Sequence, residues 1–390
     1  MSIKNIYSDI SSFGGIMQAL HDVCEGNRYE QSELSFWGNC EENIHDIADQ
    51  LSMLKYPPDK YRTFYVYEPK LREIVCSDFV TKLIHRSAYN IVNPLVCKTF
   101  IDDTYSCIKE RGSHKAALRL KSWVDYVSQN KKEKWYYLKM DVEKFFYRIN
   151  HEVLINIMGK KISDKKAMKM FEHYICEASK PFGLPLGVKN PMTIPDNEML
   201  WDVGITIGGG LSHMQGNMYM DPLDQTVKRA LKVHYYIRYM DDMVILSNDK
   251  EELHRLKREI ETFLGDVLKL RLNEKTAIRP VSQGIEFVGF RIWPNRMVLR
   301  KETSLRMKRH LKSTMEEYRR REISFEQARE VFMSYKALLR YSDSKALEDK
   351  VTREFVLTHS TKEEIREEKE LIDASVEENW YYLEDNNVRR

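Results

Sequence analysis

Three aspartates stand at the ends of short apolar segments. Asp141 closes the run that begins at Trp135, and Asp241 and Asp242 form the polar tip of an apolar stretch about 100 positions later. Adjacent like charges at a tight apolar turn repel each other and are costly to desolvate. A divalent cation compensates them best, and Mg²⁺ takes few carboxylates together with water and substrate phosphates. The pattern predicts a two-ion site for nucleotidyl transfer, in which one ion activates a primer 3′-hydroxyl and the other supports the leaving pyrophosphate.

An ordinary surface turn is the alternative for the adjacent pair. Turns favour Asp, so a solvated Asp-Asp tip is common in hairpins. Here the pair is flanked by apolar residues on both sides, within residues 235–246. A buried hairpin rarely carries two uncompensated charges at its tip, which favours the metal-binding interpretation.

The segments around these aspartates predict both strands and helices. Alternating or continuous apolar patterns indicate strands at 61–67, 135–141, 235–246 (a hairpin) and 285–300. Apolar residues at helical spacing predict helices over 12–55, 78–101 with a break near Pro94, 151–180, 212–231, 250–268 and, as two or three basic helices, 302–348. Residues 181–204 hold four prolines and are expected to form a long loop. This order predicts an α+β fold with a small antiparallel sheet backed by helices.

The composition of the 390 residues excludes several classes of protein. Hydrophobic residues make up 42% and charged residues 31%, as in ordinary globular proteins, and no apolar run reaches the ~18 residues of a membrane span. The N-terminus has no secretory pattern, and the six scattered cysteines form no CxxC pair. These features argue against a disulfide scaffold or a zinc ribbon and predict a cytoplasmic protein.

Charge is unevenly distributed along the chain. Residues 361–390 carry ten acidic and five basic side chains, whereas residues 1–360 have a net charge of +8. A basic body is compatible with a nucleic-acid partner. A solvated charged surface explains the same numbers equally well.

Several segments together resemble reverse transcriptases and follow that family's order. Residues 239–242 (YMDD) resemble the YxDD signature, and residues 138–149 (LKMDVEKFFYRI) resemble the first carboxylate motif. Further similar blocks are YEPKLREI at 67–74, HRSAYNIVNP at 85–94, residues 105–116, IGGGLSH at 207–213, LNEKT at 272–276 and FVGF at 287–290. The blocks at 85–94 and 105–116 resemble bacterial enzymes of the group II intron kind.

The resemblance implies a right-hand polymerase fold. Its parts would be a helical N-terminal extension (1–60), fingers (61–133), a palm (134–150 and 205–292) with a fingers insertion (151–204), a helical thumb (293–348) and a charged tail (349–390). Cationic thumb residues between 300 and 321 would hold a heteroduplex through its phosphates, the alternative being a solvated face. About 45 residues follow position 345, so no nuclease or maturase-like domain is expected after it.

The resemblance also implies a metal site. Asp141, Asp241 and Asp242 would be the catalytic residues, and together with Val142 they would hold two Mg²⁺ ions, with Mn²⁺ as an alternative ion.

Substrate contacts are implied for a second set of residues: Lys70, Arg72, Phe146, Gly208, Ser212, Tyr239 and Lys275. The two fingers cations and the lysine at 275 would meet the triphosphate, and Phe146 would be a steric gate against a 2′-hydroxyl. The alternatives are solvent-facing cations, core packing for one of the rings at 145 and 146, and Ser212 as a helix cap.

Two departures from the family pattern bear on the biological role. Ile207 stands where many reverse transcriptases carry Gln. An isoleucine at this position resembles diversity-generating retroelement enzymes, which copy adenines carelessly, but His213 stands where those enzymes usually carry Gln. His213, the modest net charge and the acidic tail favour the defence-associated enzymes of bacteria and phages instead. The expected partners are an RNA template, in particular a companion non-coding RNA, the DNA product, dNTPs, and an accessory protein or second copy, with no membrane. An inactive RNA-binding scaffold is the alternative from another class.

Overall fold

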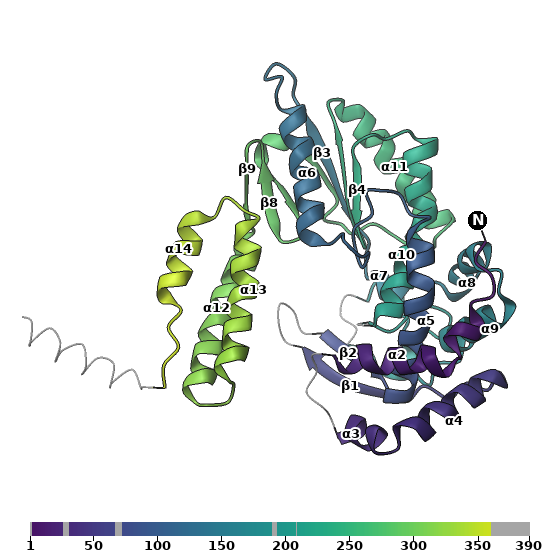
Figure 1. The fold of residues 1–390 in the computed structure, drawn as a ribbon. Helices are drawn as coiled ribbons and strands as arrows, with labels where there is room; N and C mark the ends of the chain where they lie inside the picture. The colour runs from purple at the N-terminus through teal and green to yellow at the C-terminus, as the bar shows by residue number, and fades with distance from the viewer. Residues whose placement is uncertain (1, 26–30, 67–71, 189–192, 208, 360–390) are drawn as a thin grey trace, which may run out of the picture. The chain divides into compact units, whose positions relative to one another are not determined.

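The computed structural model describes residues 2–25, 31–66, 72–188, 193–207 and 209–359 (Figure 1). The chain divides into two compact units. The first comprises residues 1–288 and 292–294, and the second comprises residues 289–291 and 295–390. Within the described residues, no helix is both long and apolar enough to cross a membrane.

The central sheet of the first unit has four antiparallel strands in the order β4-β5-β3-β6. They are β3 (Tyr136–Asp141), β4 (Tyr236–Tyr239), β5 (Asp242–Ser247) and β6 (Ala277–Pro280). β5 is an interior strand and is buried from Met243 to Ser247, which explains its continuous apolar sequence. The strand ending at Asp141 and the hairpin around Asp241 are therefore confirmed, and they lie side by side.

One helix, α10 (Gly210–Gln225), lies at the centre of the first unit. Almost every residue from Leu211 to Asp224 is buried, including several polar ones, and a helix buried on all sides lies inside a core. It packs against three other helices, namely α5 (Phe79–Cys97), α8 (His151–Lys161) and α11 (Lys250–Asp266). α11 also packs on β3, β5 and β6, so the sheet and α10 share one hydrophobic core.

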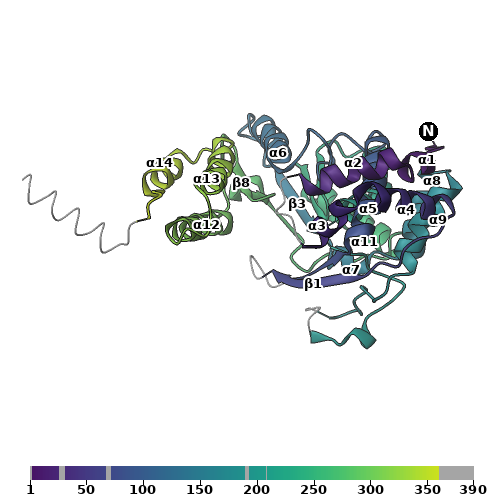
Figure 2. The ribbon, with the colours of Figure 1, turned by 60° about the horizontal axis from the view of Figure 1, so that its bottom comes forward.

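The N-terminal part of the first unit is helical. Its helices are α1 (Tyr7–Ile10), α2 (Phe13–Cys24), α3 (Gln31–Gly38) and α4 (Cys40–Ser52). α2 packs against α4 and α5, and it lies beside α5 in both ribbon views (Figures 1 and 2). After these helices, β1 (Tyr61–Val66) and β2 (Arg72–Ser77) form a two-stranded antiparallel ladder. The predicted helical region and the strand at 61–66 are confirmed.

The remaining elements are two further helices of ordinary length, several short turns of helix and a small three-stranded sheet. They are α6 (Ser113–Val127), α7 (Phe145–Arg148), α9 (Lys165–Cys176), η2 (Asp196–Glu198), the π-turn η3 (Thr226–Ala230), η4 (Val281–Gln283), and the sheet of β7 (Ile285–Phe287), β8 (Phe290–Trp293) and β9 (Arg296–Leu299).

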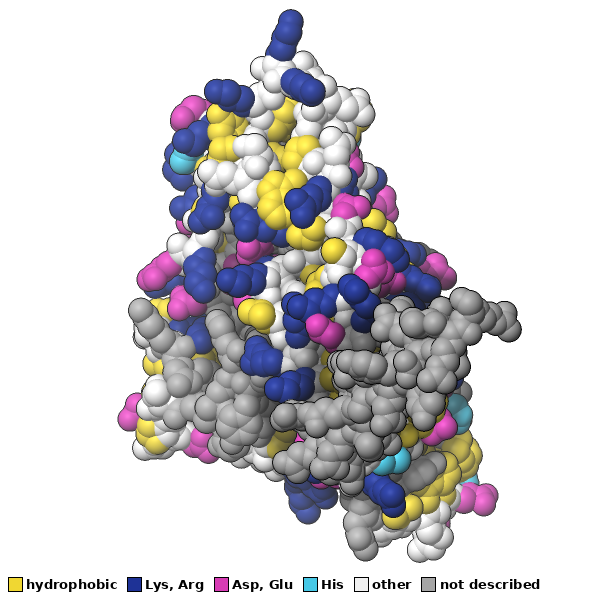
Figure 3. All heavy atoms as spheres, turned by 90° about the vertical axis from the view of Figure 1, so that its left-hand side faces the viewer, with side chains coloured by type: hydrophobic (Ala, Val, Ile, Leu, Met, Phe, Trp, Pro, Cys, Tyr) yellow, Lys and Arg dark blue, Asp and Glu magenta, His cyan; other side chains and the backbone are white. Residues whose placement is uncertain are grey.

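The second unit contains three helices among its described residues. They are α12 (Lys301–Arg319), α13 (Phe325–Arg340) and α14 (Lys345–Glu354), and α13 packs against both of the others. On the face of the molecule drawn in Figure 3, numerous Lys and Arg side chains lie among scattered acidic ones. Some of these helices' cations are paired locally, as Arg319 is with Glu316. The predicted set of basic helices is confirmed.

Two local expectations are corrected by the structure, and one helix was missed. α5 continues through Pro94 without the expected break, with Val92 and Val96 buried on either side, because core packing outweighs the lost backbone hydrogen bond. α10 begins at Gly210 with Gly209 as its N-cap, so Ser212 lies in the first turn and is not the cap. Helix α6 was not predicted, although its buried residues Ala116, Leu120 and Val127 recur at helical spacing.

Candidate active site

Two of the three aspartates meet at the end of the central sheet. Asp141 ends β3, Asp242 begins β5 directly opposite it in the antiparallel register, and Asp241 lies in the two-residue turn before β5. A hydrogen bond joins the carboxyl groups of Asp141 and Asp241. Residues 100 positions apart are thus brought into contact by a strand pair whose apolar sequences require burial.

The electrostatics of this pair are those of carboxyls crowded in a partly dry site. Burial raises the pKa of Asp141. Burial, together with the charges of Asp141 and Asp242, raises the pKa of Asp241 to about 7. Two carboxylates in one site cannot both stay ionised without a compensating charge. Hard cations with oxygen ligands supply that charge, so the donor set fits a divalent metal ion.

Asp242 has a different neighbour. Its carboxylate forms an ion pair with the ammonium of Lys139, which lies on the same face of the sheet as Asp141. The carboxylate oxygens of the three aspartates do not all lie within 4.8 Å of one another. Within the described part of the chain, the group that does so is His21, Asp22 and Glu25 at the surface end of α2. The structure brings Asp141 and Asp241 together and holds Asp242 beside them through a lysine.

The loop after α11 supports Asp141 from a third side. The amide of Asn273 donates to the Asp141 carboxylate at 3.2 Å, and its backbone N–H donates to the Asp141 carbonyl at 2.7 Å. The buried Val142 pairs with Leu272 in an isolated antiparallel bridge. Asn273 was not predicted as a site residue, although it belongs to the LNEKT block that accompanies the aspartates in the sequence.

Lys275 lies close to the same carboxylate. It is exposed, its backbone N–H donates to the Asn273 side chain at 3.0 Å, and its charge opposes the rise in the pKa of Asp141. The Lys275 ammonium is therefore close enough to Asp141 to interact electrostatically with an anion bound beside the aspartates.

Two aromatic rings lie behind the aspartates. Phe145 is buried, as one of the two rings was expected to be, and Phe146 is only partly buried. The Phe146 ring meets the ring of His213 edge-on, with centroids 5.5 Å apart. A Cβ atom added to Gly216 of α10 would lie 3.1 Å from Phe145 and 3.2 Å from the sulfur of Met240. Gly216 therefore lets α10 approach both the rings and the aspartate turn.

The loop before α10 carries the other polar side chains of the site. Ser212 is buried, and its hydroxyl lies 3.0 Å from that of Thr206. The Nδ1–H of His213 donates to the Gly209 carbonyl at 2.9 Å, and burial lowers the pKa of the His213 imidazole. Tyr239 is partly buried on β4 and pairs with Asp242 in the strand register.

Part of the predicted substrate-binding set lies outside the described residues. The residues concerned are Lys70, Gly208 and the side chain of Arg72, whose backbone belongs to β2 opposite Val66. Neighbouring described residues line a cavity of about 280 Å³. They are Asp22, Val23, Val75 to Ser77, Lys82, His85, Arg86, Tyr89, Thr206 and Gly209 to Ser212. The size of the cavity is close to the lower end of small-ligand sites.

Comparisons with known proteins agree with these motifs. Residues 67–292, more than half of the chain, match the family described as reverse transcriptase (RNA-dependent DNA polymerase). The group II intron-encoded protein LtrA of Lactococcus lactis subsp. cremoris is 24% identical over 333 residues, which cover 72% of this chain and 54% of that protein. Protein YkfC of Escherichia coli (strain K12) is 22% identical over 281 residues, covering 63% of this chain and 70% of that one.

Solved structures also resemble this chain. The apo telomerase from Candida tropicalis superposes with a TM-score of 0.43 at 15% identity, covering 64% of this chain and 52% of that one. The chain spans about half the length of LtrA. With its α+β right-hand polymerase fold and its ordered motifs around paired aspartates, the chain belongs to the reverse transcriptase family.

Proposed function

We propose that this protein is an RNA-directed DNA polymerase that synthesises DNA from dNTPs by two-metal nucleotidyl transfer. The observation that carries the proposal is the contact between the carboxyls of Asp141 and Asp241, in register with Asp242, within the region that matches the family. Carboxyls held so close favour the binding of divalent cations.

The aspartates are proposed as the metal ligands, together with Val142. Mg²⁺ or Mn²⁺ bound there would activate the primer 3′-hydroxyl and stabilise charge on the leaving pyrophosphate. The chain's own part is to hold the acceptors. Asp141 is oriented by Asn273. Lys139 keeps Asp242 in position by its ion pair until a cation competes for the carboxylate.

The nucleotide is proposed to bind between the aspartates and the fingers. Lys70, Arg72 and Lys275 would pair with the triphosphate. Gly208, Ser212 and Tyr239 would line the base and sugar. Phe146 would exclude a 2′-hydroxyl, a role consistent with its partial exposure beside the buried Phe145.

The domain boundaries predicted from the resemblance are retained as part of the proposal. Residues 61–133 and 151–204 would be fingers, residues 134–150 and 205–292 palm, and residues 293–348 thumb. The exposed cations of α12, including Lys308 and Lys312, would hold the heteroduplex through its phosphates.

The template is proposed to be a companion non-coding RNA, and the role antiphage defence. His213 and the net charge of −5 in residues 361–390 motivate this choice over retroelement diversification. Ile207 is the one observation that favours the alternative, an error-prone enzyme, because it removes a polar contact near the template base.

The test is primer extension on a defined RNA template by the full chain. Replacing both Asp241 and Asp242 by Ala should abolish DNA synthesis while RNA binding persists. DNA synthesis by the double variant would refute the metal assignment. Absence of synthesis by the unaltered protein, with RNA binding retained, would favour the inactive scaffold.

A second measurement separates the biological roles. Nucleic acid that copurifies with the protein from cells would be sequenced. One abundant non-coding RNA with matching DNA supports the defence role, whereas DNA with errors confined to template adenines supports diversification.

A further inference from the structure

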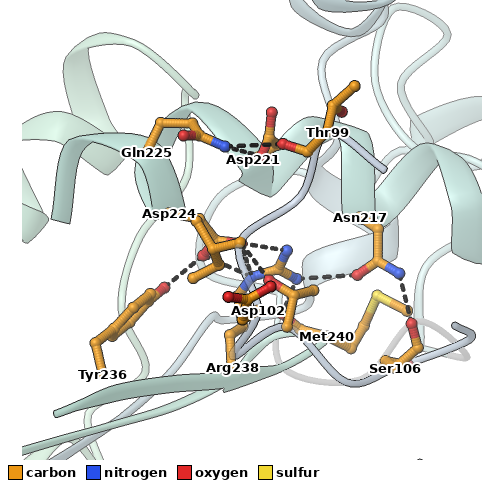
Figure 4. A network of polar contacts seen from close by, with 12 residues as sticks. Thr99, Asp102, Ser106, Asn217, Asp221, Asp224, Gln225, Tyr236, Arg238 and Met240 are labelled. Atoms are coloured by element: carbon orange, nitrogen blue, oxygen red, sulfur yellow. Dashed lines mark hydrogen bonds and ion pairs between the residues drawn. The ribbon is translucent and has the colours of Figure 1, made fainter. Parts of the chain in front are cut away.

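Arg238 of β4 is a fully buried arginine three positions before Asp241. Its guanidinium makes a fork with Asp224 of α10, with Nε 2.8 Å and 2.9 Å from the two carboxylate oxygens and Nη2 2.7 Å from one of them (Figure 4). Both side chains are 0% exposed. A planar fork of this kind fixes direction as well as charge.

The carboxylate of Asp224 is satisfied from other sides too. The hydroxyl of Tyr236 donates to one oxygen at 2.7 Å, and the hydroxyl of Thr104 donates to the other at 2.9 Å. A buried ion pair with complete hydrogen bonding is rigid, whereas one that loses a partner is strongly destabilised. Asp224 therefore holds the guanidinium in one orientation.

The second terminal nitrogen of Arg238 is directed at the aspartate turn. Nη1 donates to the carbonyl of Met240 at 2.9 Å and to the side-chain oxygen of Asn217 at 3.1 Å. Met240 precedes Asp241 and has a left-handed backbone with φ 57°. The Met240 carbonyl is part of the planar peptide that leads into Asp241, so the hydrogen bond from Arg238 restrains the orientation of that peptide.

Asn217 links this contact to a further segment. Its amide nitrogen donates to the carbonyl of Ser106 at 2.7 Å (Figure 4). The guanidinium of Arg238 is thus connected to α10, to the aspartate turn and, through Asn217, to the loop at Ser106. An ion pair that served stability alone would not require the contact with the aspartate turn.

We propose that Arg238 is a positioning residue for Asp241. Through the Met240 carbonyl it sets the direction of the metal-binding carboxylate, and Asp224 and Asn217 hold the guanidinium in place. This inference rests on the proposed function of the aspartates, but it concerns the affinity of the site for a divalent ion.

The experiment compares Arg238→Lys with Tyr236→Phe in the full chain. Lysine keeps the charge beside Asp224 but lacks the fork that reaches Met240. Tyr236→Phe removes a hydrogen bond from the same carboxylate and leaves the Met240 contact untouched. The readouts are Mn²⁺ binding by electron paramagnetic resonance, the Mg²⁺ dependence and the kcat and KM for dNTP of primer extension, and thermal unfolding.

We expect Arg238→Lys to weaken Mn²⁺ binding about 10- to 100-fold, as loss of a residue supporting a metal ligand does, with kcat lowered and KM for dNTP unchanged. Tyr236→Phe should lower the melting temperature without changing Mn²⁺ affinity. Equal Mn²⁺ affinity in both variants would overturn the proposal and leave Arg238 with a structural role only.

Asn217→Ala covers the case in which Arg238→Lys does not fold. It keeps the ion pair and removes a contact that shares Nη1 with Met240, so a smaller loss of Mn²⁺ affinity is expected and an unchanged affinity would contradict the proposal. The two proposals can fail separately. If the unaltered protein makes no DNA on an RNA template but the variants still lose Mn²⁺ affinity, the positioning role is supported and the proposed function is refuted.

Discussion

At the scale of single residues, the site places carboxyl groups of like charge close together and compensates them only in part. Asp141 and Asp241 share a hydrogen bond, whereas Asp242 is held by Lys139. The arrangement is unfavourable for the folded protein at neutral pH and favourable for a cation, as expected where function and stability compete.

Asp241→Asn should raise the thermal stability of the protein at pH 8 in the presence of a chelator. The pKa of Asp241 is raised to about 7 from an ordinary value near 3.8, so the folded state binds more protons than the unfolded state between these values. The stability of the unaltered protein therefore falls as pH rises through this window. Asparagine removes that dependence, so the gain should vanish near pH 4.

Melting curves across this pH range, with and without Mg²⁺, check the prediction. Mg²⁺ should stabilise the unaltered protein and not the variant, and DNA synthesis by the variant should fall by roughly a thousand-fold or more. A variant less stable than the parent at pH 8 would show that the ionised Asp241 carboxylate does not destabilise the folded protein.

Phe146→Ala should reduce the preference for dNTPs over rNTPs by about tenfold or more, because the ring proposed to exclude the 2′-hydroxyl is removed. His213→Ala should have a smaller effect in the same direction, because His213 supports the Phe146 ring from its edge at a centroid distance of 5.5 Å. The ratio of kcat/KM for the two nucleotides measures both effects. Unchanged discrimination in Phe146→Ala would exclude this ring as the gate.

At the scale of elements, α10 determines how closely the rings and the aspartate turn approach each other. Its Gly216 leaves room for Phe145 and Met240, and its Asn217 and Asp224 hold Arg238. One helix therefore supports both the aromatic rings and the aspartate turn.

Gly216→Ala tests this close approach. Alanine in a helix gains about 1 kcal/mol over glycine, whereas overpacking a core costs about 1–3 kcal/mol. We expect a small net loss of stability and a disproportionate loss of DNA synthesis, because the added methyl group would push Met240 and its neighbour Asp241. Chemical denaturation and primer extension measure the two quantities; loss of activity only in proportion to stability would contradict the expectation.

Local patterns in the sequence were sufficient to predict the elements that carry the aspartates. The apolar run before Asp141 and the hairpin at Asp241 are strands in the structure because a buried sheet needs such sequences. The predicted break at Pro94 was wrong, because tertiary packing of α5 outweighs the local preference of proline to interrupt a helix. The ion pair of Lys139 with Asp242 and the network of Arg238 could not be predicted, since each depends on contacts between distant strands and helices.

At the scale of the whole molecule, charge is the property most relevant to a nucleic-acid partner. α12 in the second unit presents Lys308 and Lys312 as exposed side chains. On α14, by contrast, Lys345 forms ion pairs with Glu348 and Asp349 of its own helix.

Replacing Lys308 and Lys312 together by Gln should weaken binding of an RNA–DNA duplex uniformly across sequences. The slope of log affinity against log salt should fall by about 2, one for each lost phosphate contact. Lys345→Gln is the matched control and should leave the slope unchanged. Titrations at several salt concentrations measure it, and equal slopes for all three proteins would refute a phosphate-binding role for α12.

The edge of the central sheet at β4 has a further consequence. The backbone groups of Arg238 that face away from β5 are already paired, because its N–H donates to the Asp103 carbonyl at 3.0 Å and its carbonyl accepts from Tyr105 at 3.1 Å. The guanidinium of Arg111 holds this covering loop through the carbonyls of Ile101, Asp102 and Thr104. Exposed strand edges template aggregation. The loop therefore protects the aspartate-bearing sheet at Arg238 from being extended by a strand of another chain.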